Sequence, residues 1–583
     1  MIKARIPAQY PDTANLSHYE KTRASFSWKD VENRFYSDGP DKCNIIAESI
    51  DRWAKHEGTR DHPALVFESR NYRGTWTYRQ LKDISCKWAH MLVKYGFEKG
   101  DRLMVFMPAC PETWFAMAAC ARIGVIFCPV FPTSTLYEVE ARVAGITPKG
   151  VLTTPDLVEK LPLKSSTHIE VVFLQMGPKP GLFPKEIIAA DVAAQMPEEN
   201  IICHFSKDTP LYMIFTSGST RPPKGIIHCH GDMTGIYATG AWVLDIKPDT
   251  MLWTDADPAW VTGTVYGAYA PWLHGISSLV IGDGFSAANW YHFLERWRVS
   301  VWYTTPRILA DMMAAGEDLP TRYDLSALLH IVTVGAPLVP DVIYWCRKHL
   351  HLTPHDTWWM TETGIACIAN TPGEDIKPGA MGRPLPGIDA AILDENNDPL
   401  PPMSIGELAL APGWPGMMTG IFNDPDRYAT YFSDNGWFVT GDIALQDDEG
   451  YFYHHGRNDD LLKAGDNKLI GPFEIEQLLC MHPAVAEAAV IAKGTEPGRS
   501  VSYLKAFITP SNGYIPSSRL SYEIKAFLRG NLTADLLVQE VEFIESLPRT
   551  RSGKLLRRIL RARELGLPGG EPKNMKDDVR DPK

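Results

Sequence analysis

Short apolar runs alternate with stretches of helical periodicity through most of the chain before residue 382. Residues 103–107 and 125–130 are apolar runs typical of buried strands, and residues 110–123 between them have the spacing of a helix. Strands and helices that alternate in this way form parallel sheets covered by helices. The pattern predicts an α/β fold, with a large N-terminal domain of parallel sheets and covering helices.

The same alternation places further elements on both sides of this segment. We predict helices at residues 44–55, 78–95, 188–199, 288–298, 305–315 and 340–351, with Thr77 as a cap of the second. We predict strands at residues 212–215, 251–254, 278–281 and 331–337.

The sequence pattern changes after residue 382, where short strand-like runs alternate with turns rich in Gly, Pro, Asn and Asp. These pieces predict a β-rich subdomain, and the short helices and strands after it predict a smaller, mobile α+β C-terminal domain. The last residues have few apolar anchors and are expected to be flexible. The predicted boundaries are 1–458 for the N-terminal domain, 381–458 for its β-rich subdomain, 459–567 for the C-terminal domain and 568–583 for the tail.

The composition is that of a globular protein with an acidic balance. The 583 residues are 45% hydrophobic and 22% charged, and the net charge of −12 argues against a general nucleic-acid-binding function. None of the ten cysteines forms a C-x-x-C pair, and reduced thiols favour a cytoplasmic location. The most apolar stretch, residues 114–131, carries Arg122, so we predict a buried helix and strand there and no membrane span.

A hydroxyl- and glycine-rich loop follows the predicted strand at residues 212–215. It reads Thr216-Ser217-Gly218-Ser219-Thr220-Arg221-Pro222-Pro223-Lys224-Gly225. Small residues beside glycine let backbone N–H groups approach an anion, and Lys224 adds positive charge. The loop is expected to hold phosphate, and it lacks the order of a Walker A loop. A polar turn after a strand is the alternative.

Two carboxylates follow apolar strands further along the chain. Glu362 lies between Thr361 and Thr363, so a carboxylate that could hold Mg²⁺ is flanked by hydroxyls that could bind phosphate. Asp442 follows an apolar run and could accept hydrogen bonds from both hydroxyls of a ribose. The alternatives are a buried strand with a helix cap for the first and a hairpin turn for the second.

Two charged segments that contain glycine lie toward the C-terminus. The first, Gly456-Arg457-Asn458-Asp459-Asp460, falls where the composition changes, and it suits a hinge or a solvated linker. The second, Pro548-Arg549-Thr550-Arg551-Ser552-Gly553-Lys554, puts a lysine on a flexible loop. That lysine could be delivered to a distant anion, and a basic surface loop is the alternative.

In this order, these stretches resemble the adenylate-forming superfamily of acyl-CoA synthetases, luciferases and peptide-synthetase adenylation domains, and most of all the AMP-forming acetyl-CoA synthetases. The resemblance implies an enzyme that uses ATP, Mg²⁺ and coenzyme A. A carboxylate attacks the α-phosphate of ATP and gives an acyl-adenylate and pyrophosphate, and the CoA thiol then releases acyl-CoA and AMP. The expected partners are these small molecules, and the sequence leaves the oligomeric state open.

The resemblance also implies roles for single residues. Lys554, Thr361 and Glu362 would be catalytic, with Glu362 as the metal ligand and Asp459 as the hinge of the small domain. The residues implied to bind the nucleotide are Thr216, Ser217, Gly218, Ser219, Thr220 and Lys224 at the phosphates, Gly335, Ala336, Pro337, Asp356, Thr357 and Trp358 at the adenine, Asp442 and Arg457 at the ribose, and Lys468 near the usual nucleotide-contacting arginine.

A short acid pocket is implied as well. Trp359 matches the tryptophan that closes the pocket in acetyl-CoA synthetases, and the other lining residues would be Trp260, Val261, Thr262 and Val334. An indole there leaves room for a methyl or ethyl group and excludes longer chains by steric clash. We therefore predict activation of a short carboxylate, acetate or propionate, in a reaction that could run in either direction. The alternatives are a medium-chain or aromatic acid, and an adenylate-binding protein without turnover.

Several positions depart from the pattern of the acetyl-CoA synthetases. Arg221 replaces a glycine in the phosphate loop, Ala336 an acidic residue and Met360 a glutamine. Between Lys463 and Gly471 the chain is one residue longer than the pattern of the acetyl-CoA synthetases. These differences bear on nucleotide kinetics and on the thioester step more than on adenylation.

Overall fold

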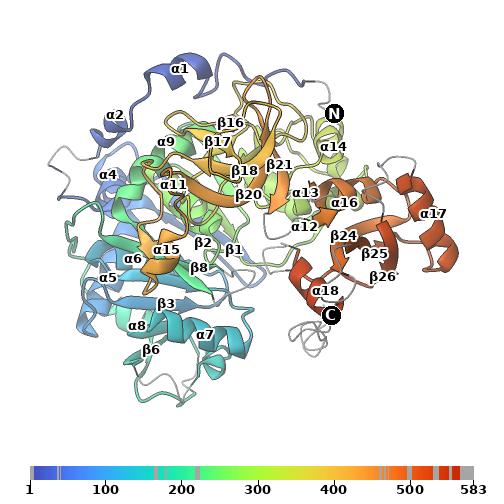
Figure 1. The fold of residues 1–583 in the computed structure, drawn as a ribbon. Helices are drawn as coiled ribbons and strands as arrows, with labels where there is room; N and C mark the ends of the chain where they lie inside the picture. The colour runs from blue at the N-terminus through green and yellow to red at the C-terminus, as the bar shows by residue number, and fades with distance from the viewer. Residues whose placement is uncertain are drawn as a thin grey trace. The chain divides into compact units, whose positions relative to one another are not determined.

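The computed structural model of the chain describes residues 5–35, 39, 41–162, 168–177, 180–216, 223–457, 462–464, 468–470, 472–494, 502–529, 538–549 and 555–564. These residues pack as two units, each considered by itself below. Unit 1 comprises Met1–Asp389 and Ala411–Phe438, and unit 2 comprises Ala390–Leu410 and Val439–Lys583. Unit 1 is large and has several sheets with covering helices, and unit 2 is smaller and mixed, so the predicted α/β fold class is confirmed (Figure 1).

The larger sheet of unit 1 carries the segments predicted to bind adenine and acid. Its central strands pair in parallel, and the strands at both ends pair in antiparallel. In hydrogen-bonded order they are β16 (Arg383–Pro384), β15 (Ile368–Ala369), β14 (His355–Trp358), β13 (His330–Thr333), β12 (Val301–Thr304), β10 (Met251–Thr254), β11 (Ser277–Ile281), β1 (Pro63–Ser69) and β2 (Tyr72–Thr77).

The second sheet of unit 1 carries the strand before the phosphate loop. It is parallel from β7 to β8 and antiparallel at β9 and β19. Its order is β19 (Gly420–Ile421), β9 (Lys224–Cys229), β8 (Pro210–Thr216), β4 (Ile126–Val130), β3 (Arg102–Phe106), β5 (Gly150–Thr153), β6 (Val171–Leu174) and β7 (Glu186–Ile188).

The helices of unit 1 have identifiable start signals. Helix α5 begins after Thr77, whose hydroxyl accepts from the backbone N–H of Gln80 while the Gln80 side chain accepts from the N–H of Thr77. The α-helices are α1 (Tyr19–Ser25), α2 (Trp28–Glu32), α3 (Ile45–Glu48), α4 (Ile50–Lys55), α5 (Tyr78–Lys94), α6 (Pro111–Ile123), α7 (Leu136–Ile146), α8 (Ala189–Ala194), α9 (Met233–Val243), α10 (Val261–Thr264), α11 (Ala270–His274), α12 (Ala287–Arg296), α13 (Pro306–Ala314), α14 (Pro340–His349) and α15 (Pro425–Ala429). Val265–Tyr269 between α10 and α11 is a π-helix.

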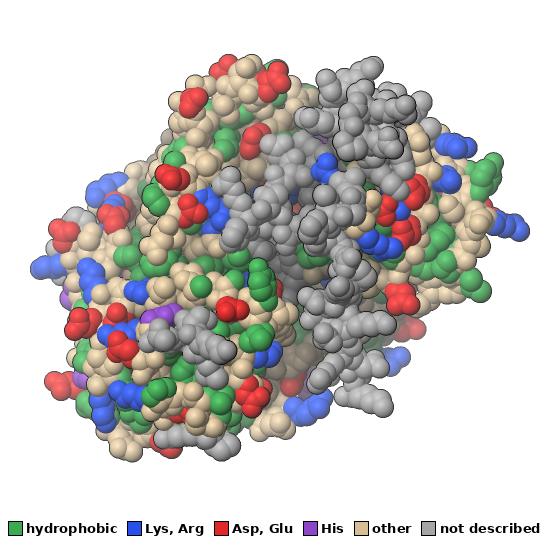
Figure 2. All heavy atoms as spheres, turned by 60° about the horizontal axis from the view of Figure 1, so that its bottom comes forward, with side chains coloured by type: hydrophobic (Ala, Val, Ile, Leu, Met, Phe, Trp, Pro, Cys, Tyr) green, Lys and Arg blue, Asp and Glu red, His purple; other side chains and the backbone are tan. Residues whose placement is uncertain are grey.

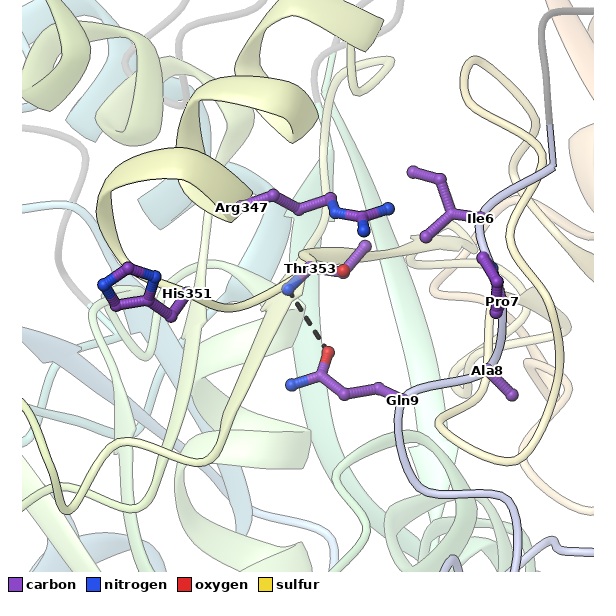
Figure 3. Close-up of a pocket in the computed structure, with 7 residues that line it drawn as sticks. All are labelled: Ile6, Pro7, Ala8, Gln9, Arg347, His351 and Thr353. Carbon is purple, nitrogen blue, oxygen red and sulfur yellow. Dashed lines mark hydrogen bonds between the residues drawn. The ribbon is translucent and has the colours of Figure 1, made fainter.

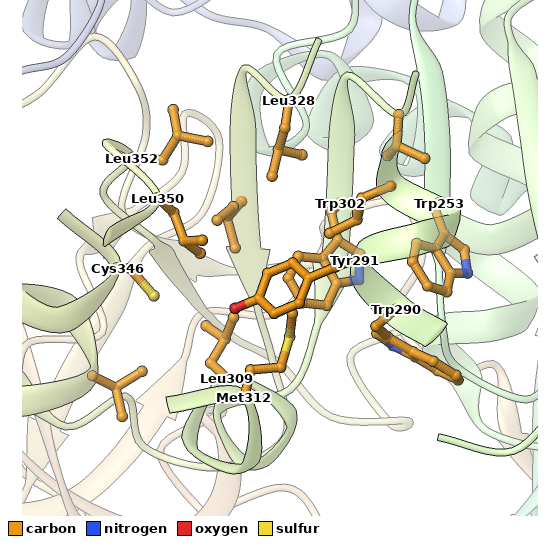
Figure 4. Packing of buried hydrophobic residues seen from close by; sticks show 14 of the residues in the cluster. Trp253, Trp290, Tyr291, Trp302, Leu309, Met312, Leu328, Cys346, Leu350 and Leu352 are labelled. Atoms are coloured by element: carbon orange, nitrogen blue, oxygen red, sulfur yellow. The ribbon is translucent and has the colours of Figure 1, made fainter. Parts of the chain in front are cut away.

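The core beside the larger sheet is rich in aromatic residues. Trp253 on β10 stacks on Trp302 of β12, with 6.0 Å between ring centroids, and both indoles are fully buried. Helices α12 and α13 cover them with Trp290, Leu309 and other apolar side chains (Figure 4). This packing fixes the β10–β12 pair, and the segment after β10 leads to Trp260 of the predicted acid pocket.

Among its described residues, unit 2 contains three smaller sheets. The first has the order β17 (Ala390–Leu393), β18 (Ile405–Leu410), β20 (Phe438–Gln446) and β21 (Phe452–Arg457), and the second pairs β22 (Leu462–Ala464) with β23 (Lys468–Ile470). The third joins β24 (Val485–Gly494), β25 (Ser502–Pro510) and β26 (Val538–Phe543), with helices α16 (Pro472–Cys480), α17 (Ser518–Arg529) and α18 (Arg557–Glu564).

Two predicted helices differ from the structure. The helix predicted at 44–55 is broken at Ser49, whose φ of −116° and ψ of −95° are not helical and whose hydroxyl donates back to the Ile45 carbonyl. The helix predicted at 188–199 is only Ala189–Ala194. The predicted boundary at Asp459 lies outside the described residues, so it stays a prediction, and the same is true of the tail at 568–583.

Unit 1 has a paired charge in its interior, and its surface carries charged side chains of both signs. Arg122 is fully buried at the end of α6, and its guanidinium lies 2.6 Å from the Asp51 carboxylate, so its charge is paired in the interior. On the face shown in Figure 2, acidic and basic side chains of the described residues are interspersed. None of the helices among the described residues combines the length and the apolar content that a membrane crossing needs.

Candidate active site

The start of β9 brings Lys224, the last charged residue of the predicted phosphate loop, to the turn that contains Thr361 and Glu362. The two strands pair in antiparallel with Thr216 opposite Lys224. The Thr216 hydroxyl is buried and has no hydrogen-bond partner among the described residues. Ser217, Gly218, Ser219, Thr220 and Arg221 between the strands lie outside the described residues, so their contacts with phosphate remain predictions.

Lys224 and Glu362 meet in a buried ion pair. The Lys224 Nζ lies 2.6 Å from the Glu362 Oε1, and 9% or less of either residue is exposed. The Tyr431 hydroxyl donates to the same carboxylate oxygen at 3.0 Å, and the Lys224 ammonium lies 4.4 Å from the centroid of the Tyr431 ring. Two residues that lie 138 positions apart in sequence, each assigned to the same chemistry, are thus in direct contact.

The turn that carries Thr361 and Glu362 is held by a histidine. His228 is fully buried on β9, and its Nε2 lies 2.8 Å from the Thr361 carbonyl oxygen. Its Nδ1 lies 2.8 Å from the Asp232 Oδ2. A carbonyl can only accept, so the Nε2–H of His228 donates to it. The backbone N–H of Met418 donates to the Glu362 carbonyl at 3.0 Å, which anchors the turn from the other side.

These residues can be tested for their fit to Mg²⁺. Mg²⁺ is commonly bound by one or two carboxylates together with water and substrate phosphates. Within the part of the chain that the structure describes, no group of three or more His, Cys, Asp or Glu side chains could hold a metal ion. The single Glu362 carboxylate is a ligand of the kind that Mg²⁺ uses when substrate phosphates and water complete its coordination.

The predicted adenine residues lie at the ends of two neighbouring strands. Strand β13 runs parallel to β14 with Thr333 opposite Asp356, and the Thr333 hydroxyl donates to the Asp356 Oδ1 at 2.8 Å. Gly335 follows β13 with a φ of +90°, which favours glycine. Gly335 and Ala336 are exposed, Pro337 is half-buried, and Thr357 and Trp358 are buried at the end of β14.

Asp356 should make the stability of the protein depend on pH. Burial raises the pKa of its carboxyl from 3.8 to about 7, against the effect of its hydrogen bonds. The folded state then binds more protons than the unfolded state between these values, so the unfolding free energy falls as pH rises from about 4 to about 7. In Asp356→Asn we expect a slope flatter by up to about 1.4 kcal/mol per pH unit.

Urea unfolding of both proteins at several pH values between 5 and 8 measures these slopes. The difference between the two proteins isolates Asp356 from Asp255 and Asp257, whose pKa values burial also raises, to about 6. Parallel curves for the two proteins would show that the carboxyl of Asp356 is already ionised at pH 5.

The predicted acid-pocket residues gather at the same strand ends. A Cβ atom at Gly335, next to Val334, would lie 2.9 Å from the Trp260 ring, so this glycine lets the indole approach the backbone. Trp260 directly precedes α10, in which Val261 and Thr262 are buried. The π-helix that follows α10 places Tyr266 edge-on to Trp359, with 5.0 Å between centroids and 89° between planes. The Trp359 Nε1 donates to the Tyr303 hydroxyl at 3.0 Å.

Asp442 and Arg457 form a pair in unit 2. Asp442 on β20 lies opposite Arg457 on β21, and the guanidinium is 2.8 Å from the Asp442 carboxylate. The His454 Nε2 lies 3.6 Å from the other carboxylate oxygen. Gly441, with a φ of +74°, lies within the strand. The hairpin-turn alternative for Gly441-Asp442 is therefore wrong, because this sequence lies inside a paired strand.

The side chains of three predicted residues of the C-terminal region lie outside the described part of the chain. Asp459 and Lys554 lie outside the described residues. The backbone of Lys468 begins β23, and its side chain is outside the described part of the chain. Their roles as hinge, catalytic lysine and nucleotide contact remain predictions from the resemblance.

A separate surface hollow of about 400 Å³ lies between the N-terminal segment and the end of α14 (Figure 3). Across it the Thr353 backbone N–H donates to the Gln9 side chain at 3.2 Å. Its lining residues are Ile6, Pro7, Ala8, Gln9, Arg347, His351 and Thr353. None of them is a predicted site residue, so the hollow is not the predicted nucleotide or acid site.

Sequence reasoning missed five residues that support the site: His228, Asp232, Tyr266, Tyr303 and Tyr431. No motif described above assigns a role to His228. The other four carry no local motif.

The chain was compared with known proteins. Residues 50–422 match the AMP-binding enzyme family, and residues 474–554 match the AMP-binding enzyme C-terminal domain. The chain is 42% identical to the acetyl-coenzyme A synthetase of Bacillus subtilis (strain 168) over 97% of this chain and 98% of that protein. It is 34% identical to the acetyl-coenzyme A synthetase of Methanothrix thermoacetophila over 91% of this chain and 84% of that protein.

Two solved structures are also similar. An acyl-CoA synthetase from Brucella canis has 27% identity and a TM-score of 0.73 over 94% of this chain and 99% of that chain. An anthranilate CoA ligase in complex with anthranoyl-AMP, with 24% identity, shares the fold at a TM-score of 0.81 over 91% of this chain and 98% of that chain. From the match over most of its length and from these relatives, the chain belongs to the AMP-binding enzyme family.

Proposed function

We propose that the protein is an AMP-forming acetate–CoA ligase. It activates acetate with ATP to acetyl-adenylate and then transfers the acetyl group to the thiol of coenzyme A. The observation that carries this proposal is the buried pair of Lys224 and Glu362. It joins the start of β9, just after the predicted phosphate loop, to the turn that follows β14, in a chain 42% identical to an acetyl-coenzyme A synthetase.

The first step brings an anionic carboxylate to an anionic phosphate. Positive charge and backbone N–H groups fixed around the phosphates lower this repulsion and hold the reactants in line. Lys224 supplies one such charge, and Glu362 would hold Mg²⁺, which neutralises phosphate charge when bound. His228 and Met418 keep the Glu362 backbone in place. Lys554 would add a second positive charge for adenylation only.

The nucleotide would be oriented by groups at strand ends. Gly335, Ala336 and Pro337 expose backbone beside β14, which suits a flat adenine ring. Asp442 would accept hydrogen bonds from the ribose hydroxyls, and its pairing with Arg457 orients its carboxylate for that role. A turn of the predicted C-terminal domain, residues 459–567, about Asp459 would exchange the adenylation and thioester arrangements.

The choice of acid would be made by Trp359. Its indole is 8% exposed and is held on two sides by tyrosines, so it forms a firm wall rather than a mobile side chain. Such a wall admits acetate and, with less room, propionate. A larger medium-chain or aromatic acid would need this indole to move.

The proposal is tested by ATP–pyrophosphate exchange with acetate, followed by detection of acetyl-CoA after CoA is added. We expect exchange with acetate and propionate and none with octanoate or benzoate. Exchange with benzoate alone would support the aromatic-acid alternative. Folded protein without exchange for any acid would support the binding protein without turnover, and exchange without a thioester product would place a defect in the second step.

A further inference from the structure

We propose that Tyr303 is a specificity-determining positioning residue, whose hydroxyl fixes the Trp359 indole and so sets the length of acid that the enzyme accepts. The inference rests on the proposed function, because it assigns Trp359 to the acid pocket. Tyr303 lies on β12 and Trp359 follows β14, so the contact joins two strands that β13 separates.

The hydrogen bonds around Tyr303 have a single direction. The Trp359 Nε1 can only donate, so the Tyr303 oxygen accepts from it at 3.0 Å. The Thr357 hydroxyl donates its one proton to the Thr333 carbonyl at 2.7 Å, so it must accept from the Tyr303 hydroxyl, also at 2.7 Å. The chain of donors therefore runs from the indole through the phenol and the threonine to a backbone carbonyl.

A second chain of the same form holds Tyr266. The Ala366 backbone N–H donates to the Tyr266 hydroxyl at 2.8 Å. The Thr239 hydroxyl donates to the Gly235 carbonyl at 2.8 Å, so it accepts from Tyr266, again at 2.8 Å. Tyr266 presents its ring at 89° to the indole, and it lies 5.6 Å from the Tyr303 ring.

The two tyrosines act differently on the indole. Tyr266 supports the ring by packing, and only Tyr303 hydrogen-bonds to its nitrogen. Burial raises the pKa of the Tyr303 hydroxyl well above its ordinary value, so the phenol keeps the proton that it donates to Thr357. Thr357 also belongs to the predicted adenine strand, so the wall of the acid pocket is tied to the backbone that would carry the nucleotide.

A fixed wall discriminates between acids better than a mobile one. A side chain with several rotamers can move aside for an extra methylene at small cost, whereas a hydrogen-bonded indole must break that bond to do so. In Tyr303→Phe the indole N–H loses its acceptor while the ring volume stays almost the same. The wall then gains freedom, and longer acids gain access relative to acetate.

The experiment measures kcat/KM for acetate, propionate and butyrate in wild type and Tyr303→Phe. We expect the acetate-to-butyrate ratio to fall about tenfold, with the KM for ATP changed less than about twofold. Tyr269→Phe is the matched control. It removes the same hydroxyl from a fully buried tyrosine of the neighbouring π-helix, whose oxygen has no partner among the described residues, and the ratio should stay at the wild-type value.

A double-mutant cycle with Trp359→Phe separates positioning from general loosening of the core. Phenylalanine has no N–H, so adding Tyr303→Phe should leave the acetate-to-butyrate ratio of Trp359→Phe unchanged. A further fall of similar size would overturn the proposal, as would a wild-type ratio in Tyr303→Phe alone. Calorimetric dissociation constants for non-hydrolysable acetyl- and butyryl-adenylate analogues give the same ratio without turnover. They test the inference even if the proposed ligase activity is absent.

Discussion

Replacing Glu362 by Gln is expected to lower the rate of acetate-dependent ATP–pyrophosphate exchange about a thousandfold. Two effects add. The buried Lys224 ammonium loses the carboxylate 2.6 Å away, and the nucleotide-bound Mg²⁺ loses its only proposed protein ligand. The amide fills nearly the same volume and still accepts from Tyr431, so the effect reports charge rather than packing. Exchange rates and calorimetric binding of ATP with and without Mg²⁺ measure it.

Glu68→Gln is the matched control for this change. Glu68 in unit 1 is 7% exposed, compared with 5% for Glu362, and Arg73 lies 2.7 Å from its carboxylate. The substitution removes a buried, paired charge that no motif places at the site, so we expect some loss of stability and exchange within about threefold of wild type. Exchange by Glu362→Gln within tenfold of wild type, or Mg²⁺ enhancement of ATP binding equal to wild type, would contradict the proposed role of Glu362.

The sequence predicted best the elements whose signals are local. Thr77 and Gln80 form the capping box that begins α5, and the pattern of residues 251–254 coincides with strand β10. Both depend on neighbours within a few positions. The break at Ser49 could not be predicted in the same way, because the apolar spacing continues across it and the side-chain bond to Ile45 replaces helical geometry.

The site shows the same division between local and distant signals. The resemblance assigns Glu362 and Trp359 to the site through the motifs that contain them, and these roles stay predictions. It did not locate the residues that hold them, because Tyr431 lies 69 positions from Glu362 and Tyr303 lies 56 positions from Trp359. These contacts can be predicted only when the order of strands in the sheet is known, and the spacing of apolar residues does not determine that order. His228 was visible as a residue type, and its role required the position of the Thr361 carbonyl.

Asp442 is a predicted site residue whose local conformation the sequence left open. Gly-Asp is a good turn sequence, and a turn was one of the two alternatives. The structure places the pair inside β20, where the positive φ of Gly441 lets the strand pass close to the Arg457 guanidinium. A Cβ atom at Gly441 would lie 3.2 Å from the flexible end of Arg457, and the φ of +74° by itself favours glycine, so the backbone conformation accounts for this glycine.

Replacing Trp359 by Gly should convert the preference of the enzyme from acetate to longer acids. The indole is the proposed wall against longer acids, and its removal would leave a space beside Tyr266 and Tyr303, the two residues that contact it. We expect kcat/KM for acetate to fall and that for pentanoate or hexanoate to rise, so that their ratio changes by a factor of about 10²–10³. Rates of CoA-thioester formation across linear acids from two to eight carbons measure this change.

Trp345→Gly separates a change of pocket from a cavity in the core. Trp345 on α14 is 7% exposed, compared with 8% for Trp359, and it belongs to the core cluster of unit 1. Its removal should cost several kcal/mol of stability, as a large buried cavity does, and leave the order of acid preference unchanged. The order of acid preference therefore distinguishes a changed pocket from a destabilised core, whereas the absolute rates of thioester formation do not. If Trp359→Gly kept the wild-type order while remaining folded, another side chain would have to limit acid length.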